Sequence, residues 1–173
     1  MSRRQPQRNI VLIGFHKSGL TTVGRELARR LHRPFIDIPV EVQRRQRLTV
    51  FQLPGLSRPT NASDVERRII GDLAYRRETI VALGSDGGWD AQTLDDLKVY
   101  AYVVFLDMPF ELLWRRIEAE GLPGQPAEAR GADSLRRQWQ ARRPEFEQCD
   151  LQLVDAGANP RRLVQLILHC FYT

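Results

Sequence analysis

The chain has 173 residues, of which 42% are hydrophobic and 27% are charged, and its formal net charge is +5. These values are ordinary for a globular protein, so we predict a single domain over residues 1–173. No apolar run reaches about 18 residues, which excludes a membrane span from the prediction. Residues 1–8 form a basic tail that we predict to be disordered, and because it does not resemble a secretory signal we expect a cytoplasmic protein.

The basic residues are almost all arginine, since only Lys17 and Lys98 are lysines. Arginine favours bidentate contacts with phosphate and carboxylate groups. The arginines occur in pairs along the chain, which is typical of solvated helix faces. No aromatic residues interleave with them, so we do not predict a nucleic-acid surface. Cys149 and Cys170 lack the spacing of metal ligands and are expected to be reduced thiols.

The first predicted elements alternate between strand and helix. An apolar run that ends in glycine predicts a buried strand at about residues 9–13. A helix over residues 21–32 follows, because its apolar residues recur at i, i+4 and i+8. Two prolines bound a second strand over residues 34–39, and a helix is predicted over residues 40–47.

The middle of the chain begins with a loop over residues 52–63, which are rich in Pro, Ser and Gly. Ser63 or Asp64 is the predicted N-cap of a helix that continues to about Tyr75. The next predicted elements are a strand, a helix capped by Asp90 and another strand, over residues 79–84, 90–99 and 101–107.

The last third opens with a helix over residues 109–120 that carries a proline in its first turn. Residues 121–133 predict a flexible, lid-like segment, and residues 134–149 a helix broken at Pro144. The closing elements are a strand over residues 151–155 and a helix over residues 160–171. Strands alternate with helices throughout, which predicts an α/β fold with a five-stranded parallel sheet between two helical layers.

The stretch GFHKSGLT follows the pattern of a phosphate-binding P-loop with one exception. Gly14 and Gly19 frame the loop at the required separation, and Thr21 holds the position of the hydroxyl that ligates Mg²⁺. Leu20 stands where the pattern has the lysine that reaches the β- and γ-phosphates. We predict that the loop, including Ser18, binds a nucleotide. The alternative is an ordinary glycine turn in an α/β protein.

Lys17 precedes the missing lysine by three positions and is the candidate to replace it. Its stem would then have to fold back over the loop. The alternative is that Lys17 and its neighbour His16 face solvent or a partner.

With this loop in place, the chain resembles the shikimate kinases over residues 9–172. The resemblance rests on the order and spacing of several stretches, namely NIVLIG, TTVGRELARRL, PFIDI, ETIVALG, YVVFLDMPFELLWRRI, ARRPEF and LVDAGANPRRLVQLIL. Shikimate kinases use ATP and Mg²⁺ to phosphorylate the 3-hydroxyl of shikimate. The resemblance therefore implies a P-loop kinase fold with a mobile lid, and a protein that is a monomer. It also implies ATP and Mg²⁺ as cofactors, and a nucleotide and a small anionic metabolite as partners.

Several positions match residues that the family uses for the nucleotide and the metal. Asp37 matches an aspartate near Mg²⁺, so with Thr21 it is a candidate metal ligand and a candidate catalytic residue. Arg116 matches the arginine that stacks on adenine. Asn159 lies in the segment 155–160, which matches the loop that closes over adenine. The alternatives are a solvated strand end for Asp37 and an exposed helix position for Arg116.

Two positions match the substrate site of the family. Arg142 matches the arginine that holds the shikimate carboxylate, and Gly84 begins the family's glycine platform. Other substrate positions differ. The departures are Pro39 in place of a second aspartate, Ser85 and Asp86 in place of two glycines, Ser63 in place of a second carboxylate-binding arginine, and Arg130 as the only arginine of the lid-like segment, out of register.

Three hypotheses follow. The first is a shikimate-kinase-like protein that binds a nucleotide or small anion but is weak or inactive toward shikimate, because several catalytic groups are altered. The second is an active ATP-dependent small-molecule kinase in which Lys17 or an arginine replaces the P-loop lysine and Asp37 or Asp86 acts as base. The third is an arginine-rich interaction module that binds no nucleotide.

Overall fold

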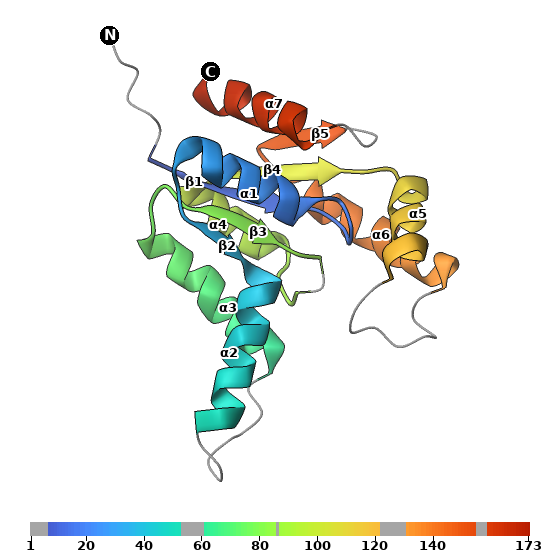
Figure 1. Ribbon diagram of the computed structural model, residues 1–173, viewed down its shortest axis with the longest axis horizontal. Coiled ribbons are helices and arrows are strands. Elements are labelled where there is room, and N and C mark those ends of the chain that lie inside the picture. The colour runs from blue at the N-terminus through green and yellow to red at the C-terminus, as the bar shows by residue number, and fades with distance from the viewer. Residues whose placement is uncertain (1–6, 53–60, 86, 122–130, 155–158) are drawn as a thin grey trace.

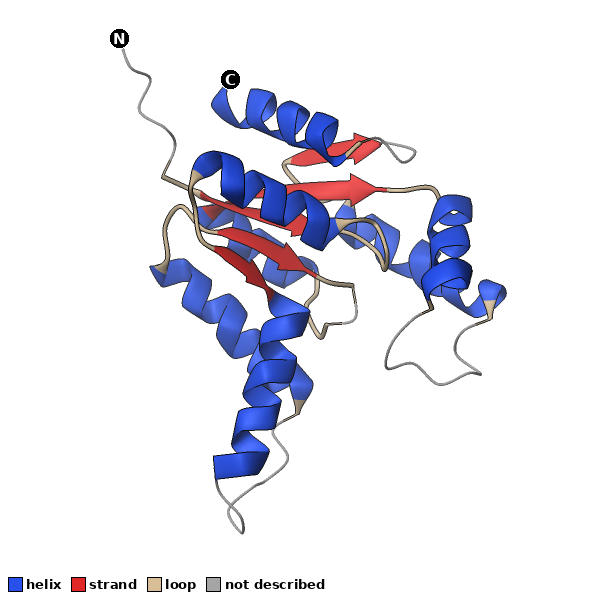
Figure 2. Cartoon of the chain, viewed as in Figure 1, coloured by secondary structure: helices blue, strands red, loops and turns tan. Residues whose placement is uncertain are grey.

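The computed structural model describes residues 7–52, 61–85, 87–121, 131–154 and 159–173 (Figure 1). At the centre of these residues is one sheet of five strands, β1 (Asn9–Ile13), β2 (Phe35–Asp37), β3 (Ile80–Leu83), β4 (Ala101–Asp107) and β5 (Leu151–Val154). The strand order is β2-β3-β1-β4-β5, and every neighbouring pair is parallel (Figure 2). The predicted α/β fold with a five-stranded parallel sheet is confirmed.

Helices cover both faces of this sheet (Figure 1). The described helices are α1 (Leu20–Leu31), α2 (Ile38–Gln52), α3 (Ala62–Asp72), α4 (Ala91–Tyr100), α5 (Phe110–Glu120), α6 (Ala132–Phe146) and α7 (Pro160–Tyr172), with a 3₁₀ turn over Leu73–Tyr75. Helices α1 and α7 pack on one face. The opposite face is covered by α2, α3, α4 and the end of α6.

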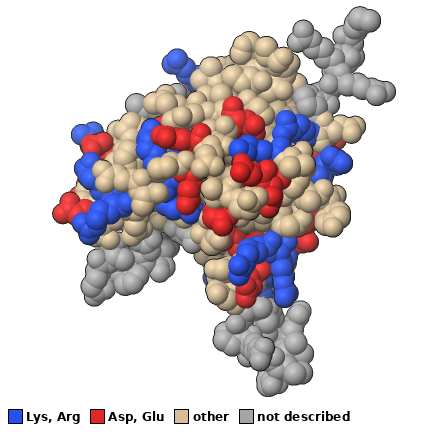
Figure 3. Space-filling model, turned by 180° about the vertical axis from the view of Figure 1, so that it is seen from behind, with Lys and Arg blue, Asp and Glu red and all other residues tan. Residues whose placement is uncertain are grey.

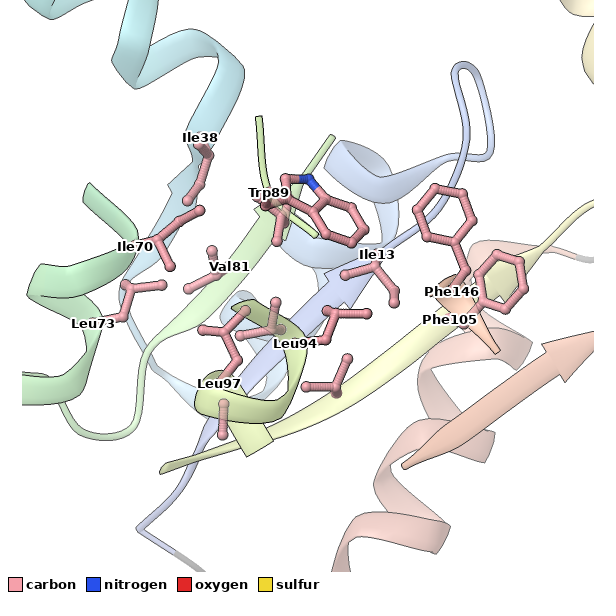
Figure 4. Packing of buried hydrophobic residues seen from close by; sticks show 14 of the residues in the cluster. Ile13, Ile38, Ile70, Leu73, Val81, Trp89, Leu94, Leu97, Phe105 and Phe146 are labelled. Carbon is pink, nitrogen blue, oxygen red and sulfur yellow. The ribbon is translucent and has the colours of Figure 1, made fainter. Parts of the chain in front are cut away.

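The central strand β1 is buried on both faces, which fits its position in the middle of a parallel sheet. Ile10 and Leu12 point to the layer of α1 and α7, whereas Val11 and Ile13 point to the other layer. In that second layer aromatic rings pack beside Ile13 at the carboxyl ends of the strands (Figure 4). The P-loop emerges at these carboxyl ends, which are the end of an open α/β sheet where ligands bind.

The second strand is shorter and the following helix longer than predicted. Strand β2 ends at Asp37 and α2 begins directly at Ile38, rather than at residue 40. Pro39 lies in the first turn of α2, where a missing N–H group needs no intrahelical partner. The buried side chain of Ile38 anchors this turn in the core. The helix then continues to Gln52, into the segment predicted as a loop.

Two predicted helix starts are wrong. Helix α3 is capped by Asn61, whose side chain accepts a hydrogen bond from the Ser63 amide at 3.2 Å, so neither Ser63 nor Asp64 is the N-cap. Pro109 is the N-cap of α5 instead of a first-turn residue. The capping of α4 by Asp90 is confirmed.

Helix α6 is not broken at Pro144. The proline lies two residues before the end of α6, so the lost N–H donor and the clash of its ring with the preceding turn affect only the last turn, and the helix closes at Phe146 instead of residue 149. The helix also starts at Ala132, so the predicted lid-like segment 121–133 overlaps it. Residues 122–130 of that segment, and residues 1–6 of the basic tail, lie outside the described part of the chain.

Charges of both signs alternate over the face seen in Figure 3. Many of the exposed arginines form ion pairs one helical turn away, as in Arg29–Glu26, Arg44–Glu41 and Arg67–Asp64. The prediction that the paired arginines lie on solvated helix faces is therefore confirmed for these three arginines. Within the described ranges, no helix is long and apolar enough to cross a membrane.

Candidate functional site

The loop between β1 and α1 has a backbone that requires both of its framing glycines. Gly19 is the N-cap of α1 with φ 95° and ψ 17°, a left-handed conformation that glycine adopts without steric cost. At Gly14 a Cβ atom would lie 2.5 Å from Ser18 Oγ and 3.1 Å from the carbonyl oxygen of Leu106. The loop therefore has the tight shape on which the prediction of phosphate binding rests.

Ser18 places a buried hydroxyl inside this loop. The residue is 3% exposed, and its Oγ has no hydrogen-bond partner among the described residues. Unpaired buried hydroxyls are rare in native proteins. Ser18, Gly19 and Thr21 line a cavity of about 440 Å³ at the N-terminus of α1, where the first N–H groups of the helix lack intrahelical partners. This combination fits the oxygens of a phosphate group.

Leu20 makes the wall of the same cavity apolar at the lysine position. It is the first residue of α1, is half-buried, and packs against the apolar cluster between the sheet, α1 and α7. Its Cδ2 atom would lie 3.3 Å from a Cβ placed on Gly14, so the side chain lies beside the end of β1. An isobutyl group has no donor to offer a phosphate.

Thr21 and Asp37 meet at the entrance of the loop. The Thr21 hydroxyl donates a hydrogen bond of 2.6 Å to Asp37 Oδ2 at the end of β2. Hydroxyl and carboxylate oxygens are the hard ligands that Mg²⁺ prefers, and Mg²⁺ needs only one or two of them when phosphates and water complete its shell. The described residues contain no group of three or more His, Cys, Asp or Glu side chains that could hold a metal. The pair therefore fits a magnesium ion that arrives with a nucleotide.

Lys17 does not reach toward the position of the missing lysine. Its Nζ forms an ion pair of 2.9 Å with Glu120 at the end of α5. Its backbone is left-handed, with φ 60°, which costs a residue with a side chain roughly 1 kcal/mol. Its carbonyl oxygen accepts a hydrogen bond of 3.0 Å from Arg116 Nη1, so α5 holds the loop through two contacts. Lys17 and Glu120 both line the phosphate-sized cavity, and in this conformation they neutralise each other. The pKa of Glu120 is lowered by the hydrogen bond from Lys17.

A second cavity of about 220 Å³ adjoins the loop. Arg116 and Ser18 line it, together with Leu153 of β5 and Pro160 at the start of α7. A cationic plane beside an apolar wall suits the stacking of an aromatic base. Asn159 is adjacent, but its side chain caps α7 by accepting a hydrogen bond of 3.0 Å from the Arg161 amide. The other residues of the predicted adenine loop, 155–158, lie outside the described part of the chain.

Arg142 and Gly84 line a third and larger cavity of about 810 Å³. The structure thus brings together the two residues predicted to bind the substrate. The lining of this cavity also includes Phe15, Pro39 and Val42, which are apolar, whereas Ser63 adds a hydroxyl.

Pro39 and Gly84 are packed against each other in this cavity. A Cβ atom on Gly84 would lie 3.0 Å from Pro39 Cγ, so the proline ring occupies the space above the glycine. The Gly84 carbonyl oxygen accepts a hydrogen bond of 2.7 Å from Trp89 Nε1, and Trp89 is buried in the core (Figure 4). The surface at Pro39, which the resemblance aligns with a second aspartate, is therefore apolar, and the proline ring cannot accept a proton. Asp86, the other candidate base, lies outside the described residues.

The family model for shikimate kinase matches residues 17–171. The chain belongs to the shikimate kinase family. The shikimate kinase of Aquifex aeolicus is 30% identical over 159 residues, which are 92% of this chain and 93% of that relative. The shikimate kinase of Persephonella marina is 27% identical over 161 residues, which are 93% of this chain and 97% of that relative. The solved structure of the Acinetobacter baumannii shikimate kinase in complex with shikimate has a TM-score of 0.77 and 26% identity, and the match covers 96% of this chain and 93% of that chain.

This member of the shikimate kinase family contains a buried ion pair that the sequence did not reveal. Asp107, at the end of β4, is 3% exposed and accepts hydrogen bonds of 2.8 and 2.6 Å from the two terminal nitrogens of Arg143. Gln152 donates a third at 2.8 Å. Asp107 lines the cavity beside Arg116. The sequence signal for a functional residue here was a charged side chain, Asp107, at the carboxyl end of a buried strand.

Glu66 was also missed, although it lines the Arg142 cavity. It is 6% exposed, and its Oε2 accepts a hydrogen bond of 2.8 Å from the Gly88 amide. Gly87 packs so closely on the same carboxylate that a Cβ there would collide with it. Gly87 and Gly88, which follow β3, therefore make room for a buried glutamate. A charged residue within the apolar pattern of α3 was the indication.

Proposed function

We propose that this chain binds a nucleotide and a small metabolite in the shikimate-kinase manner, but phosphorylates shikimate weakly or not at all. The observation that carries the proposal is the side chain of Leu20, which lies beside β1 and leaves the phosphate cavity without the P-loop cation. The nearest ammonium group, on Lys17, is held by Glu120 at 2.9 Å.

The magnitude of the missing interaction argues against efficient turnover. Phosphoryl transfer depends on positioned positive charge, and one transition-state cation is worth 10³ to 10⁵ in rate, or roughly 4–7 kcal/mol. Pro39 removes a second contribution, since it can neither bind a substrate hydroxyl nor accept its proton. Positioning and electrostatics are almost the whole of catalysis in this reaction class, so two such losses together leave little rate acceleration.

The nucleotide framework is the part that the proposal retains. The buried hydroxyl of Ser18 and the N-terminus of α1 would hold the phosphates, and Thr21 with Asp37 would hold Mg²⁺. When bound, the metal would offset the negative charge of the phosphate oxygens. Arg116 would lie against the base, since it lines the adjoining cavity. The described residues therefore fit ATP or ADP with Mg²⁺ as a bound ligand.

One observation favours a second candidate, an active kinase that uses Lys17. The ammonium group lies on the wall of the phosphate cavity, and its residue keeps a left-handed backbone that a glycine would adopt at no cost. If Lys17 left Glu120 when a triphosphate bound, the cavity would regain a free ammonium group. This candidate predicts measurable release of ADP that disappears in Lys17→Ala.

Ligand-dependent melting and ADP release together test these readings. We expect ATP with Mg²⁺ to raise the melting temperature of the protein, because only the folded state binds it. Thr21→Val is the matched control, since it keeps the shape of the residue and removes the metal-ligating hydroxyl. We expect a coupled assay for ADP to detect little shikimate-dependent release. Robust shikimate-dependent turnover would overturn the proposal, and the absence of any nucleotide-induced shift would favour an interaction module.

A further inference from the structure

Arg142 uses its guanidinium within its own chain. Its Nη1 donates hydrogen bonds of 3.0 Å to the Trp89 carbonyl oxygen and 2.5 Å to Glu145 Oε2. The guanidinium carbon lies 4.4 Å from the centre of the Trp89 ring and 5.6 Å from that of Phe146. The cation is therefore held by a carboxylate, a carbonyl and two aromatic faces before any ligand binds.

The two nitrogens that suit a carboxylate are closed off in this arrangement. Nε and Nη2 of Arg142 are buried and have no hydrogen-bond partner among the described residues. These atoms lie on one side of the guanidinium and form the fork that binds a carboxylate through two parallel hydrogen bonds. A ligand carboxylate reaches the fork only when the guanidinium turns away from its internal contacts. The unpaired donors favour that turn, and the ion pair with Glu145 opposes it.

We propose that Glu145 is the specificity-determining residue of the 810 Å³ cavity. By holding Arg142 closed, it lowers the affinity of the cavity for carboxylates relative to uncharged molecules of the same shape. Glu145 follows Arg142 by three residues on α6, and the side chains of the pair are 22% and 31% exposed, so the ion pair is shielded from much of the solvent. The inference rests on the proposed function only in taking this cavity as the metabolite site.

A second carboxylate in the cavity supports the same direction of specificity. Glu66 is buried and lines the cavity on the side of α3. Among the described lining residues, Glu66 is the one carboxylate and Arg142 is the one arginine. The charge of Arg142 is neutralised by its ion pair with Glu145. Phe15, Pro39 and Val42 add apolar surface. Such a wall favours a neutral ligand body over an anionic one, because a buried charge without a counter-charge is costly.

Calorimetric titration with shikimate and with its methyl ester, without nucleotide, tests the inference. The two probes share a ring and hydroxyl groups and differ in one negative charge. In the wild-type protein we expect shikimate to bind no more tightly than the ester. In Glu145→Gln we expect shikimate affinity to rise about tenfold, equal to 1.4 kcal/mol, while ester affinity stays unchanged. Adding Arg142→Ala to that variant should remove the gain.

Glu147→Gln is the matched control, because Glu147 lies on the surface just after α6 and pairs with Arg143 instead of Arg142. Glu145→Ala repeats the test if the glutamine variant fails to fold. Tighter binding of shikimate than of the ester by the wild type would overturn the inference. So would an unchanged shikimate affinity in both Glu145 variants, or no binding of either probe to any variant. ATP titration of the same proteins is a separate measurement, so failure of the nucleotide proposal is distinguishable.

Discussion

Leu20→Lys restores a donor at the lysine position and measures how much of the P-loop remains. A lysine there would add a charge-assisted hydrogen bond to a bound phosphate, worth about 1.5–3 kcal/mol. This corresponds to ATP affinity that is roughly 10- to 100-fold tighter. The change also removes a half-buried leucine from the cluster under α1, which costs about 1 kcal/mol of folding free energy. For a chain of this length that loss lowers the melting temperature by roughly 2–4 °C.

The two effects separate in one pair of assays. Thermal melting without ligand reports the lost packing, and calorimetric titration with ATP and Mg²⁺ reports the gained contact. Leu20→Met is the matched control, since it keeps an apolar side chain at this position and adds no charge. We expect the methionine variant to bind ATP as the wild type does.

An unchanged ATP affinity in a folded Leu20→Lys protein would refute this reasoning. It would mean that the backbone around Gly14 and Gly19 does not cradle phosphate, despite its shape. Equal tightening in the methionine control would also refute it, because the gain would then come from packing instead of charge.

Three other perturbations have defined outcomes. Glu120→Gln frees Lys17 from its 2.9 Å ion pair, so we expect ATP affinity, measured by calorimetric titration, to rise severalfold. An unchanged affinity would show that the freed ammonium group does not reach the phosphates. Asp107→Asn breaks the buried ion pair with Arg143 of α6 and should lower the free energy of unfolding by about 2 kcal/mol. In thermal melting this corresponds to a melting temperature lower by roughly 4–8 °C, and a shift below about 1 °C would contradict a structural role. The pKa of Glu41 is lowered from 4.5 to about 2, chiefly by the hydrogen bond from Arg44, so its contribution to stability is present above pH 4.5 and is lost as the pH falls toward 2. Glu41→Gln should therefore flatten the dependence of melting temperature on pH in that range, and a parallel curve would contradict the assignment.

The order of elements could be predicted because each depends on local patterns. The apolar run before Gly14 favours a strand, and the capping sequence that begins at Asp90 favours a helix. Element boundaries depended on tertiary contacts instead. Burial of Ile38 starts α2 before Pro39, and Pro144 is tolerated because it lies in the last turn of α6. Neither effect is visible in hydrophobic periodicity.

The candidate site shows the same division. The glycines, Ser18 and Thr21 could be identified from spacing alone, since the loop is one continuous stretch. The direction of a long side chain could not, because it depends on a residue far along the sequence. Lys17 turns to Glu120, which is more than one hundred positions away, and Asp107 pairs across the fold with α6. Arg142 was predicted as a substrate ligand, whereas its internal partner Glu145 becomes important only once the helix is formed.

Consecutive arginines on α6 connect two cavities. Arg142 lies on the wall of the larger one, and Arg143 is fixed to Asp107 on the wall of the cavity beside Arg116. If a ligand in the larger cavity displaced Arg142 enough to shift α6, the contacts of Arg143 would change with it. Because linkage is reciprocal, a metabolite that alters nucleotide affinity by some factor must have its own affinity altered by the same factor. A chain that transfers phosphate poorly would still let each ligand report on the concentration of the other.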